Sequence, residues 1–440
     1  MFAKQSTRQL YESLGPARFA RRFYNAIGLA DENGRRHRDS AGNPVLKDPV
    51  ENGRTMPRIR TDTLSVRDLC ESIVGEDWHR KMNPDAAHKV SLLEEQRPLL
   101  EAGTGPLQAT DFIDINAFTI VVSGLYEVSL LEAWQNPAYI SDELAPPMPT
   151  KAFGGKKIIG TGRVGDVAEP RKPGMPTKRV QFGERWVQTP ETQENALSIE
   201  LTQEVIYLDL TGEVSKQGNE IGDWLRWRKE IRVIDCFIGV TNTYSYSGTS
   251  YNTYLTSGFF TNSLTTNELL HWTQLQTVFV TFRDMLDPTT NTRVLIRPNR
   301  ILVNLEKLAT TDAILGGSTR VEYRDIPGST SNPQQIRHFD NPYAGRLRVL
   351  ESPLVYQRCT DATGLNLSAS NAGKYYWVWE YNPNPGAGPF AYMQNWPLRF
   401  QTAAPNNIDM IDRGVVAFYK ADERGVPAVV EPRRVVQSAP

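Results

Sequence analysis

The sequence predicts an α+β fold, and two observations support this class. Apolar residues recur at helical spacing over residues 111–134 and 212–239, whereas strand-like alternation dominates residues 156–205 and the chain after residue 346. The chain of 440 residues also exceeds the roughly 250–300 residues beyond which one hydrophobic core stops growing. We therefore expect two or more packed regions.

Residues 1–145 are expected to form an N-terminal arm followed by helices. Short apolar pieces within turn-rich sequence predict an extended arm over residues 1–62. Capping residues and a shared apolar face predict a short helix over residues 65–75, and a longer one is predicted over residues 111–134. The proline-rich run that starts at Ala145 then breaks the chain, and we place the main domain boundary there.

Residues 146–205 are expected to form an extended loop built as a β-hairpin. Strand-like alternation begins near Lys156 and ends near Val205, and prolines between residues 170 and 176 stiffen the tip. Too few residues share one side for the hairpin to bury a core of its own. The hairpin is therefore expected to lie against another surface.

Residues 206–245 are dominated by one long helix. Apolar residues at spacings of three, four or seven predict a helix over residues 212–239, which would be about 40 Å long at about 1.5 Å per residue. Trp224 and Trp227 lie on this helix, where aromatic residues at helical spacing favour core packing over a cofactor pocket.

The remaining chain is divided into residues 246–405 and residues 406–440. The first of these segments is expected to begin with a helix over residues 267–285 and a strand over residues 300–304, and helix and strand alternate again over residues 305–315. From Arg346 onward the sequence predicts strands separated by turns.

The charge is balanced overall but uneven along the chain. The formal net charge is -1, from 49 basic and 50 acidic residues, which is not typical of a general nucleic-acid-binding protein. Residues 1–60 nevertheless contain 12 Lys or Arg against 6 Asp or Glu, a local charge of +6. The positive charge is therefore concentrated near the N-terminus.

The cysteines and the apolar segments indicate where the protein is made. Cys70, Cys236 and Cys359 are far apart and lack a CxxC spacing, so neither a disulfide framework nor a zinc site is expected. The N-terminus lacks the apolar run of a secretory signal, and no stretch reaches the ~18 uncharged apolar residues of a membrane span. We expect synthesis in the cytoplasm and no membrane contact.

No motif predicts catalysis. Gly160, Gly162 and Gly165 satisfy GxGxxG, but prolines rather than a helix follow them, so a dinucleotide site is not expected. The motifs GxxxxGKS/T, HExxH and GxSxG do not occur in the sequence, and its 5 histidines do not pair at metal-binding spacing. We expect a protein that is not an enzyme and has no catalytic residue, cofactor or metal.

Four tyrosines between residues 241 and 266 are a candidate for stacking on nucleic-acid bases. They are Tyr244, Tyr246, Tyr251 and Tyr254. No basic residue lies among them to contact phosphates. The sequence therefore favours a polar loop or a contact between subunits.

The order of parts resembles the major capsid proteins of the Hong Kong 97-type phage fold. The stretch LSIELTQEVIYLDLTGEVSKQGNEIGDWLRWRKEIRVID, residues 197–235, is similar to that family's passage from extended loop to spine helix. The stretch TFRDMLDPTTNTRVLIRPNRILVN, residues 281–304, is similar to its axial-domain helix, turn and strand. The segments from Asn341 and Gly414 are similar to its late axial strands and its final peripheral strands.

The resemblance implies a fold and a function. It implies an N-terminal arm, an extended loop, a peripheral domain with the spine helix, an axial domain, and C-terminal strands that return to the peripheral domain. It also implies a major capsid protein in the virion, which self-assembles as hexamers and pentamers of an icosahedral phage head around double-stranded DNA. Its partners would be copies of itself, the packaged DNA, a portal, and scaffold or decoration proteins.

Two sets of charged residues are then candidate contact sites. The extended loop offers alternating charge to a neighbouring subunit, with a solvated face as the alternative, through Arg163, Glu169, Lys172, Lys178, Arg179, Glu184 and Arg185. The basic arm offers non-specific contacts to DNA on the inner surface, through Arg18, Arg21, Arg22, Arg35, Arg36 and Arg38.

Two other functions stay open from the sequence. An encapsulin-type nanocompartment shell would share the fold but package enzymes. An α+β enzyme or carbohydrate-binding protein would use the Tyr- and Trp-rich C-terminal half.

Overall fold

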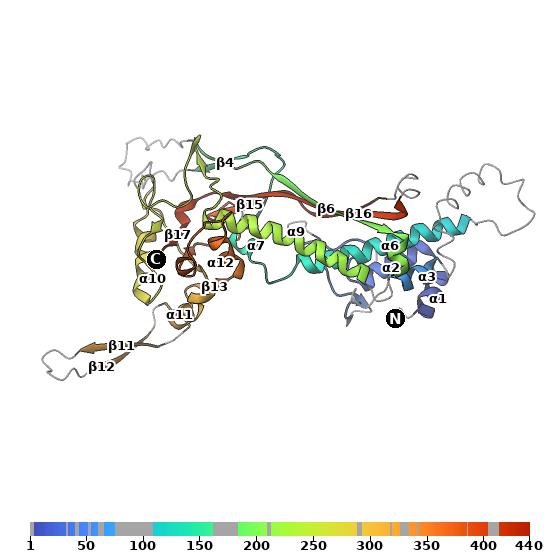
Figure 1. Cartoon of the computed structure of the whole chain (residues 1–440), viewed down its shortest axis with the longest axis horizontal. Helices are drawn as coiled ribbons and strands as arrows, with labels where there is room; N and C mark the ends of the chain where they lie inside the picture. The colour runs from blue at the N-terminus through green and yellow to red at the C-terminus, as the bar shows by residue number, and fades with distance from the viewer. Residues whose placement is uncertain are drawn as a thin grey trace, which may run out of the picture. The chain divides into compact units, whose positions relative to one another are not determined.

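A computed structural model provides the structure of the chain (Figure 1). The residues that it describes are 4–31, 34–39, 44–51, 54–59, 66–74, 109–161, 184–208, 213–287, 293–316, 319–325, 334–340, 343–384, 386–403 and 413–440.

The chain divides into two compact units. Unit 1 comprises residues 1–136, 194–227 and 396–424, and unit 2 comprises residues 137–193, 228–395 and 425–440. The division falls inside the long helix α9 (Glu213–Ile238) and inside the strands β15 (Phe390–Ala403) and β16 (Val415–Val429). The sequential segments expected from the sequence therefore differ from the compact units, because the chain enters each unit more than once.

The described helices of unit 1, apart from α9, include two where an extended arm was expected. They are α1 (Lys4–Leu14), α2 (Pro16–Ala26), α3 (Val66–Ile73), α6 (Ala109–Trp134) and α8 (Gln203–Leu208). The prediction of an extended arm is wrong for residues 4–26. Phe19, Phe23 and Ile27 recur every four residues and are buried with α3 and α6 in one core, which stabilises a helix there.

The helices α6 and α9 pack closely within unit 1. Gly218 and Gly222 lie on the side of α9 that faces α6. A Cβ atom on Gly222 would lie 2.5 Å from the carbonyl oxygen of Leu130, and one on Gly218 would lie 3.0 Å from the ring of Tyr126. The two helices can therefore approach this closely only because these positions are glycine.

Two long strands run through a four-stranded sheet with the order β3-β15-β16-β6. The outer strands are β3 (Pro147–Pro149) and β6 (Gln193–Thr202). Along β6, exposed and less exposed residues alternate, as expected for a strand with one solvated face. The strand was predicted to end near Val205, but it ends at Thr202 in the structure. Val205, Ile206 and Tyr207 lie in α8 instead.

Unit 2 is built around a mixed five-stranded sheet with the order β13-β10-β14-β17-β9. Its strands are β13 (Arg348–Glu351), β10 (Arg300–Val303), β14 (Tyr376–Trp379), β17 (Val435–Ser438) and β9 (Ser263–Leu264). In β14 the residues Trp377 and Trp379 belong to one apolar cluster, and Tyr376 and Val378 belong to another. Both faces of the sheet are therefore buried at its centre.

Helices pack around this sheet, and two of them differ from the sequence predictions. They are α7 (Ser141–Leu144), α10 (Trp272–Asp284), α11 (Leu305–Leu315), α12 (Pro353–Thr360) and α13 (Ala369–Ala372), with the 3-10 helix η2 at Pro432–Arg434. Helix α10 begins later than the predicted residue 267, because His271 caps it and the Gln274 side chain accepts a 2.8 Å hydrogen bond from the His271 backbone. Pro353 opens a helix within a stretch that was predicted to be strand.

Three smaller sheets complete the described strands. The hairpin strands β4 (Lys157–Thr161) and β5 (Glu184–Gln188) join β7 (Ser245–Tyr246) and β8 (Thr249–Ser250) in the order β4-β5-β7-β8. The pair β1 (Val50–Glu51) with β2 (Arg54–Thr55) and the pair β11 (Thr319–Asp325) with β12 (Gln334–Asp340) each form a two-stranded sheet. The α+β class is confirmed.

The tyrosine-rich stretch is part of the core of unit 2. Tyr244 is buried, and the rings of Tyr251 and Phe259 stack with their centroids 4.6 Å apart. Burial raises the pKa of Tyr254, whose hydroxyl donates a hydrogen bond to the carbonyl of Phe237. The expectation of a polar loop is therefore wrong for these tyrosines, because their rings pack together.

Candidate functional site and assembly surfaces

The hairpin has a firmly held base. Strands β4 and β5 pair antiparallel from Lys157↔Gln188 to Thr161↔Glu184. Beyond the strands, Thr189 closes the base, because its hydroxyl accepts a 2.9 Å hydrogen bond from the Lys156 backbone. Thr161 and Glu184, the described residues on either side of residues 162–183, are therefore held side by side.

The base of the hairpin also pairs with another strand of the same chain, and the sequence did not predict this pairing. Strand β5 pairs with β7 through Val187↔Tyr246 and Gln188↔Ser245. Val187 is buried in the core of unit 2, and the Lys157 ammonium lies 4.1 Å from the ring centre of Trp186. The expectation that the hairpin depends wholly on another surface therefore does not apply to its base.

The seven candidate residues of the extended loop are only partly covered by the structure. Glu184 and Arg185 lie in β5, where they pair with Thr161 and Gly160. The other five lie outside the described residues: Arg163, Glu169, Lys172, Lys178 and Arg179.

The six candidate arginines near the N-terminus are all exposed, and they lie on two neighbouring segments of unit 1. Arg18, Arg21 and Arg22 lie on α2, beside the buried Phe19 and Phe23. Arg35, Arg36 and Arg38 lie in the turn that follows α2, whose bridges are Ala30↔Arg36 and Arg38↔Pro44. The Arg21 side chain lies beside Gly34, so α2 and this turn adjoin.

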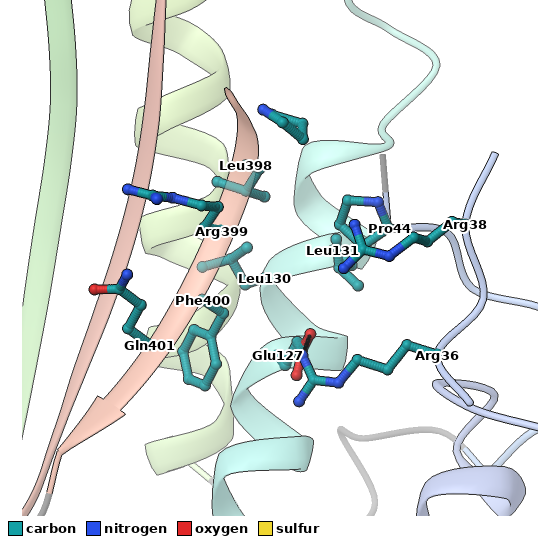
Figure 2. A pocket seen from close by; sticks show the side chains of 11 residues that line it. Arg36, Arg38, Pro44, Glu127, Leu130, Leu131, Leu398, Arg399, Phe400 and Gln401 are labelled. Carbon is teal, nitrogen blue, oxygen red and sulfur yellow. Dashed lines mark hydrogen bonds and ion pairs between the residues drawn. The ribbon is translucent and has the colours of Figure 1, made fainter. Parts of the chain in front are cut away.

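Arg36 joins this turn to α6. Its guanidinium forms an ion pair with Glu127, a residue that is almost completely buried (Figure 2). Burial raises the pKa of Glu127 to about 7, and this effect outweighs the opposite influence of Arg36 and Arg38. Arg36 therefore has a structural contact that its predicted role on the inner surface did not include.

The ion pair lines a pocket of about 300 Å³ within unit 1. Figure 2 shows the turn with Arg36 and Arg38 on one side, α6 in the middle, and Arg399 on β15 on the other side. Arg399 forms an ion pair with the fully buried Asp422, and its guanidinium lies 4.1 Å from the ring centre of Trp396. Carboxylates thus offset the charge of two arginines that line the pocket.

Two features escaped the sequence prediction. The sequence did not predict a role for Glu127, since nothing local reveals a partner 91 positions away. Trp224 and Trp227 were expected to be core residues, but they are 60% and 43% exposed, so that prediction is wrong. The exposure has no local signal either, because helical spacing alone does not distinguish an inner face from an outer one.

The described residues offer little metal or membrane chemistry. Among them, no group of three or more His, Cys, Asp or Glu side chains is placed to hold a metal ion. The helices that the structure describes include none that is long and apolar enough to cross a membrane. Cys70, Cys236 and Cys359 are buried free thiols, and burial raises the pKa of each.

Comparison with known proteins identifies the class. The model of the family described as "Phage capsid protein" matches residues 186–438, which is more than half of the chain. This stretch begins within β5 and includes α9, the five-stranded sheet and the long strands β15 and β16. The protein is therefore a structural subunit of a viral shell. The chain belongs to the phage capsid protein family.

The solved structures that match the chain have low sequence identity to it. The capsid of the cyanophage P-SCSP1u is 11% identical, covers 69% of this chain and 88% of its own, and has a TM-score of 0.42. A phage-related protein from Bordetella bronchiseptica is 14% identical over 71% of this chain and 95% of its own, with a TM-score of 0.40. The Synechococcus elongatus encapsulin is 12% identical over 66% and 83%, with a TM-score of 0.38. The comparison with curated protein sequences gave no match.

The family match confirms that the chain is a phage capsid protein and that it self-assembles into a capsid in the virion.

Proposed function

We propose that copies of this major capsid protein assemble as hexamers and pentamers of an icosahedral head that encloses double-stranded DNA. The observation that carries this proposal is the match of the phage capsid family to residues 186–438. A closed shell built from one chain requires heterologous contacts, in which different surfaces of two copies meet.

The extended loop provides one of these surfaces. Pairing of Thr161 with Glu184 supports a loop over residues 162–183 whose two ends leave the same point of unit 2. Two-stranded hairpins are at best marginally stable alone in water, which favours contact of this segment with a neighbouring copy. Its alternating charges, from Arg163 to Arg185, would then set the register of that contact.

The N-terminal arginines provide the inner surface. Arg18, Arg21 and Arg22 are exposed on one helix, and the adjoining turn adds Arg35 and Arg38. Arginines repeated over many copies would offset phosphate charge without reading bases. Synthesis in the host bacterial cytoplasm, a portal, and scaffold or decoration proteins complete the proposal.

The proposed domains follow the Hong Kong 97-type arrangement. Residues 1–145 form the N-terminal region, and residues 146–205 form the extended loop and the entry to the peripheral domain. The peripheral domain contains the spine helix, residues 206–245, and receives the C-terminal strands, residues 406–440. Residues 246–405 form the axial domain. The bounds of α9, Glu213–Ile238, support the position of the spine helix.

Electron microscopy of the protein expressed in bacteria tests this function. The chain is expressed alone and together with the other head proteins of its phage. We expect closed shells with five-fold and six-fold clusters, and nuclease-resistant DNA in shells from the phage. A chain that stays monomeric in both settings would refute the proposal, and shells that hold an enzyme instead of DNA would favour a nanocompartment.

A further inference from the structure

Helix α9 has an inverted distribution of charged and aromatic side chains. Over residues 224–230, three of the four charged residues are buried: Arg226, Lys229 and Glu230 are 4%, 3% and 1% exposed, and only Arg228 is exposed. Trp224 and Trp227 are 60% and 43% exposed. A helix on the surface of a soluble protein normally has the opposite arrangement, with charges in water and aromatic rings in the core.

The buried charges all have partners in the chain. The Lys229 ammonium lies 2.8 Å from a carboxylate oxygen of Asp142, and the carboxylate of Glu230 accepts hydrogen bonds from the backbone of Ile140 and Ser141. The Arg226 guanidinium lies 5.4 Å from the ring centre of Trp134. These contacts fix which side of the helix faces inward.

The tryptophans lie on the other side. Gly222 faces α6, and Trp224 and Trp227 follow it by two and five residues, which places them about 200° and about 140° around the helix from it. Residues three apart are neighbours on a helix surface. Trp224 and Trp227 therefore form one aromatic patch on the side of α9 opposite to α6. We call these two residues the tryptophan pair.

We propose that the tryptophan pair is an assembly contact that a second copy of this chain covers in the capsid. This inference rests on the proposed function, and it names the surface that α9 contributes to the shell. Tryptophan is enriched among the residues that dominate binding energy at protein interfaces, where it sits in desolvated pockets. Exposed aromatic patches are typical of sites that bind another protein.

A second copy is the occupant that the observations favour. Self-assembly is the interaction that membership of the capsid family establishes. Double-stranded DNA presents phosphates on its outside and keeps its base faces stacked, so it offers no apolar surface for two indole rings. A heterologous contact lets the tryptophan pair of each copy meet a different surface of the next copy, which repeats around a ring.

Oxidative footprinting with mass spectrometry tests the proposal directly. Hydroxyl radicals oxidise exposed tryptophans, and the protein is compared as unassembled subunits and as shells. We expect at least about a fivefold drop in oxidation of Trp224 and Trp227 in shells, while Trp377 and Trp379, which are 0% exposed, provide an unreactive internal reference in both states. Equal oxidation in both states would overturn the proposal. Protection already present in unassembled subunits would also overturn it, since the cover would then belong to the same chain.

Variants separate this inference from the proposed function. The double variant Trp224→Ala/Trp227→Ala should raise the concentration needed for assembly at least about tenfold. The variant Trp224→Phe/Trp227→Phe keeps aromatic surface and should assemble at a concentration within about threefold of the wild type. If the wild type forms shells and the alanine variant assembles equally well, the tryptophan contact is refuted but the proposed function is not. A wild-type chain that forms no shell refutes the proposed function.

Discussion

Gly222 on α9 lies so close to the carbonyl oxygen of Leu130 on α6 that a Cβ atom there would approach it to 2.5 Å. The same atom would lie 2.8 Å from the Cβ of Ala133. Neither neighbour is the end of a flexible side chain, so neither can move away at little cost. The close contact between α6 and α9 in unit 1 therefore depends on glycine at this position.

Gly222→Ala should destabilise the subunit. Alanine is favoured over glycine within a helix by about 1 kcal/mol, but overpacking against backbone costs about 1–3 kcal/mol and more than cancels this gain. Denaturant unfolding of the unassembled subunit measures the change. Gly154→Ala is the matched control, because no atom lies within 4 Å of its added Cβ. A Gly222→Ala subunit as stable as the wild type would show that the helices can move apart.

Glu127→Gln should change how stability depends on pH. Burial raises the pKa of Glu127 from 4.5 to about 7, so the folded subunit binds a proton more tightly than the unfolded chain. This stabilising contribution is fully present below pH 4.5 and is lost as the pH rises through about 7, and it amounts to about 3 kcal/mol.

The glutamine variant has no such titration, so its stability should fall less than that of the wild type between pH 5 and pH 8. Unfolding in denaturant at both pH values measures the difference. Parallel curves for the two proteins would mean that Glu127 has an ordinary pKa. Arg36→Gln is the companion variant, because removal of the ion pair should raise the pKa of Glu127 further.

Arg358→Met should be strongly destabilising. The Arg358 guanidinium binds Asp235 at both carboxylate oxygens, with distances of 2.7 Å and 3.0 Å, and both side chains are largely buried. Loss of Arg358 leaves the Asp235 carboxylate without this partner, at a cost of about 3–5 kcal/mol.

Arg283→Met is the control for this change. Arg283 also pairs with a carboxylate, that of Asp284, but its side chain is 64% exposed. Exposed ion pairs contribute little to stability, because water screens the two charges. If the two variants unfold at the same denaturant concentration, the Arg358 pair does not stabilise unit 2.

Replacement of Arg18, Arg21 and Arg22 by glutamine should weaken retention of DNA more than formation of shells. Each replaced arginine removes one positive charge that would contact a phosphate. The retention of DNA should therefore depend less steeply on salt concentration. Nuclease-protected DNA per shell is the measurement. Arg283→Gln/Arg293→Gln in unit 2 controls for a general change in charge. Unchanged packaging in the triple variant would place α2 away from the DNA.

The sequence predicted the elements whose signals are local. A long helix was expected over residues 212–239 and is found at Glu213–Ile238, since its apolar spacing and flanking breakers act over a few residues. The strand before α11 was expected at residues 300–304 and is found at Arg300–Val303. The buried run around Trp377 was likewise recognised as a strand.

The features that the sequence did not predict depend on packing between residues far apart in the chain. Residues 16–26 were expected to be extended, although Phe19 and Phe23 form a helix when α6 covers them. The pairing of Arg36 with Glu127 joins residues far apart in sequence. The outward position of Trp224 follows from the face that Gly222 turns toward α6, which no local pattern specifies.

Removal of the extended loop tests the central claim most directly. Because Thr161 pairs with Glu184 at the end of the hairpin base, residues 162–183 can be replaced by an Asn-Gly turn without disturbing β4, β5 or their pairing with β7. Sedimentation of wild-type and shortened chains, each expressed with the other head proteins of the phage, measures assembly. The account predicts wild-type shells and a shortened chain that remains folded but sediments as unassembled subunits. Normal shells from the shortened chain would contradict it.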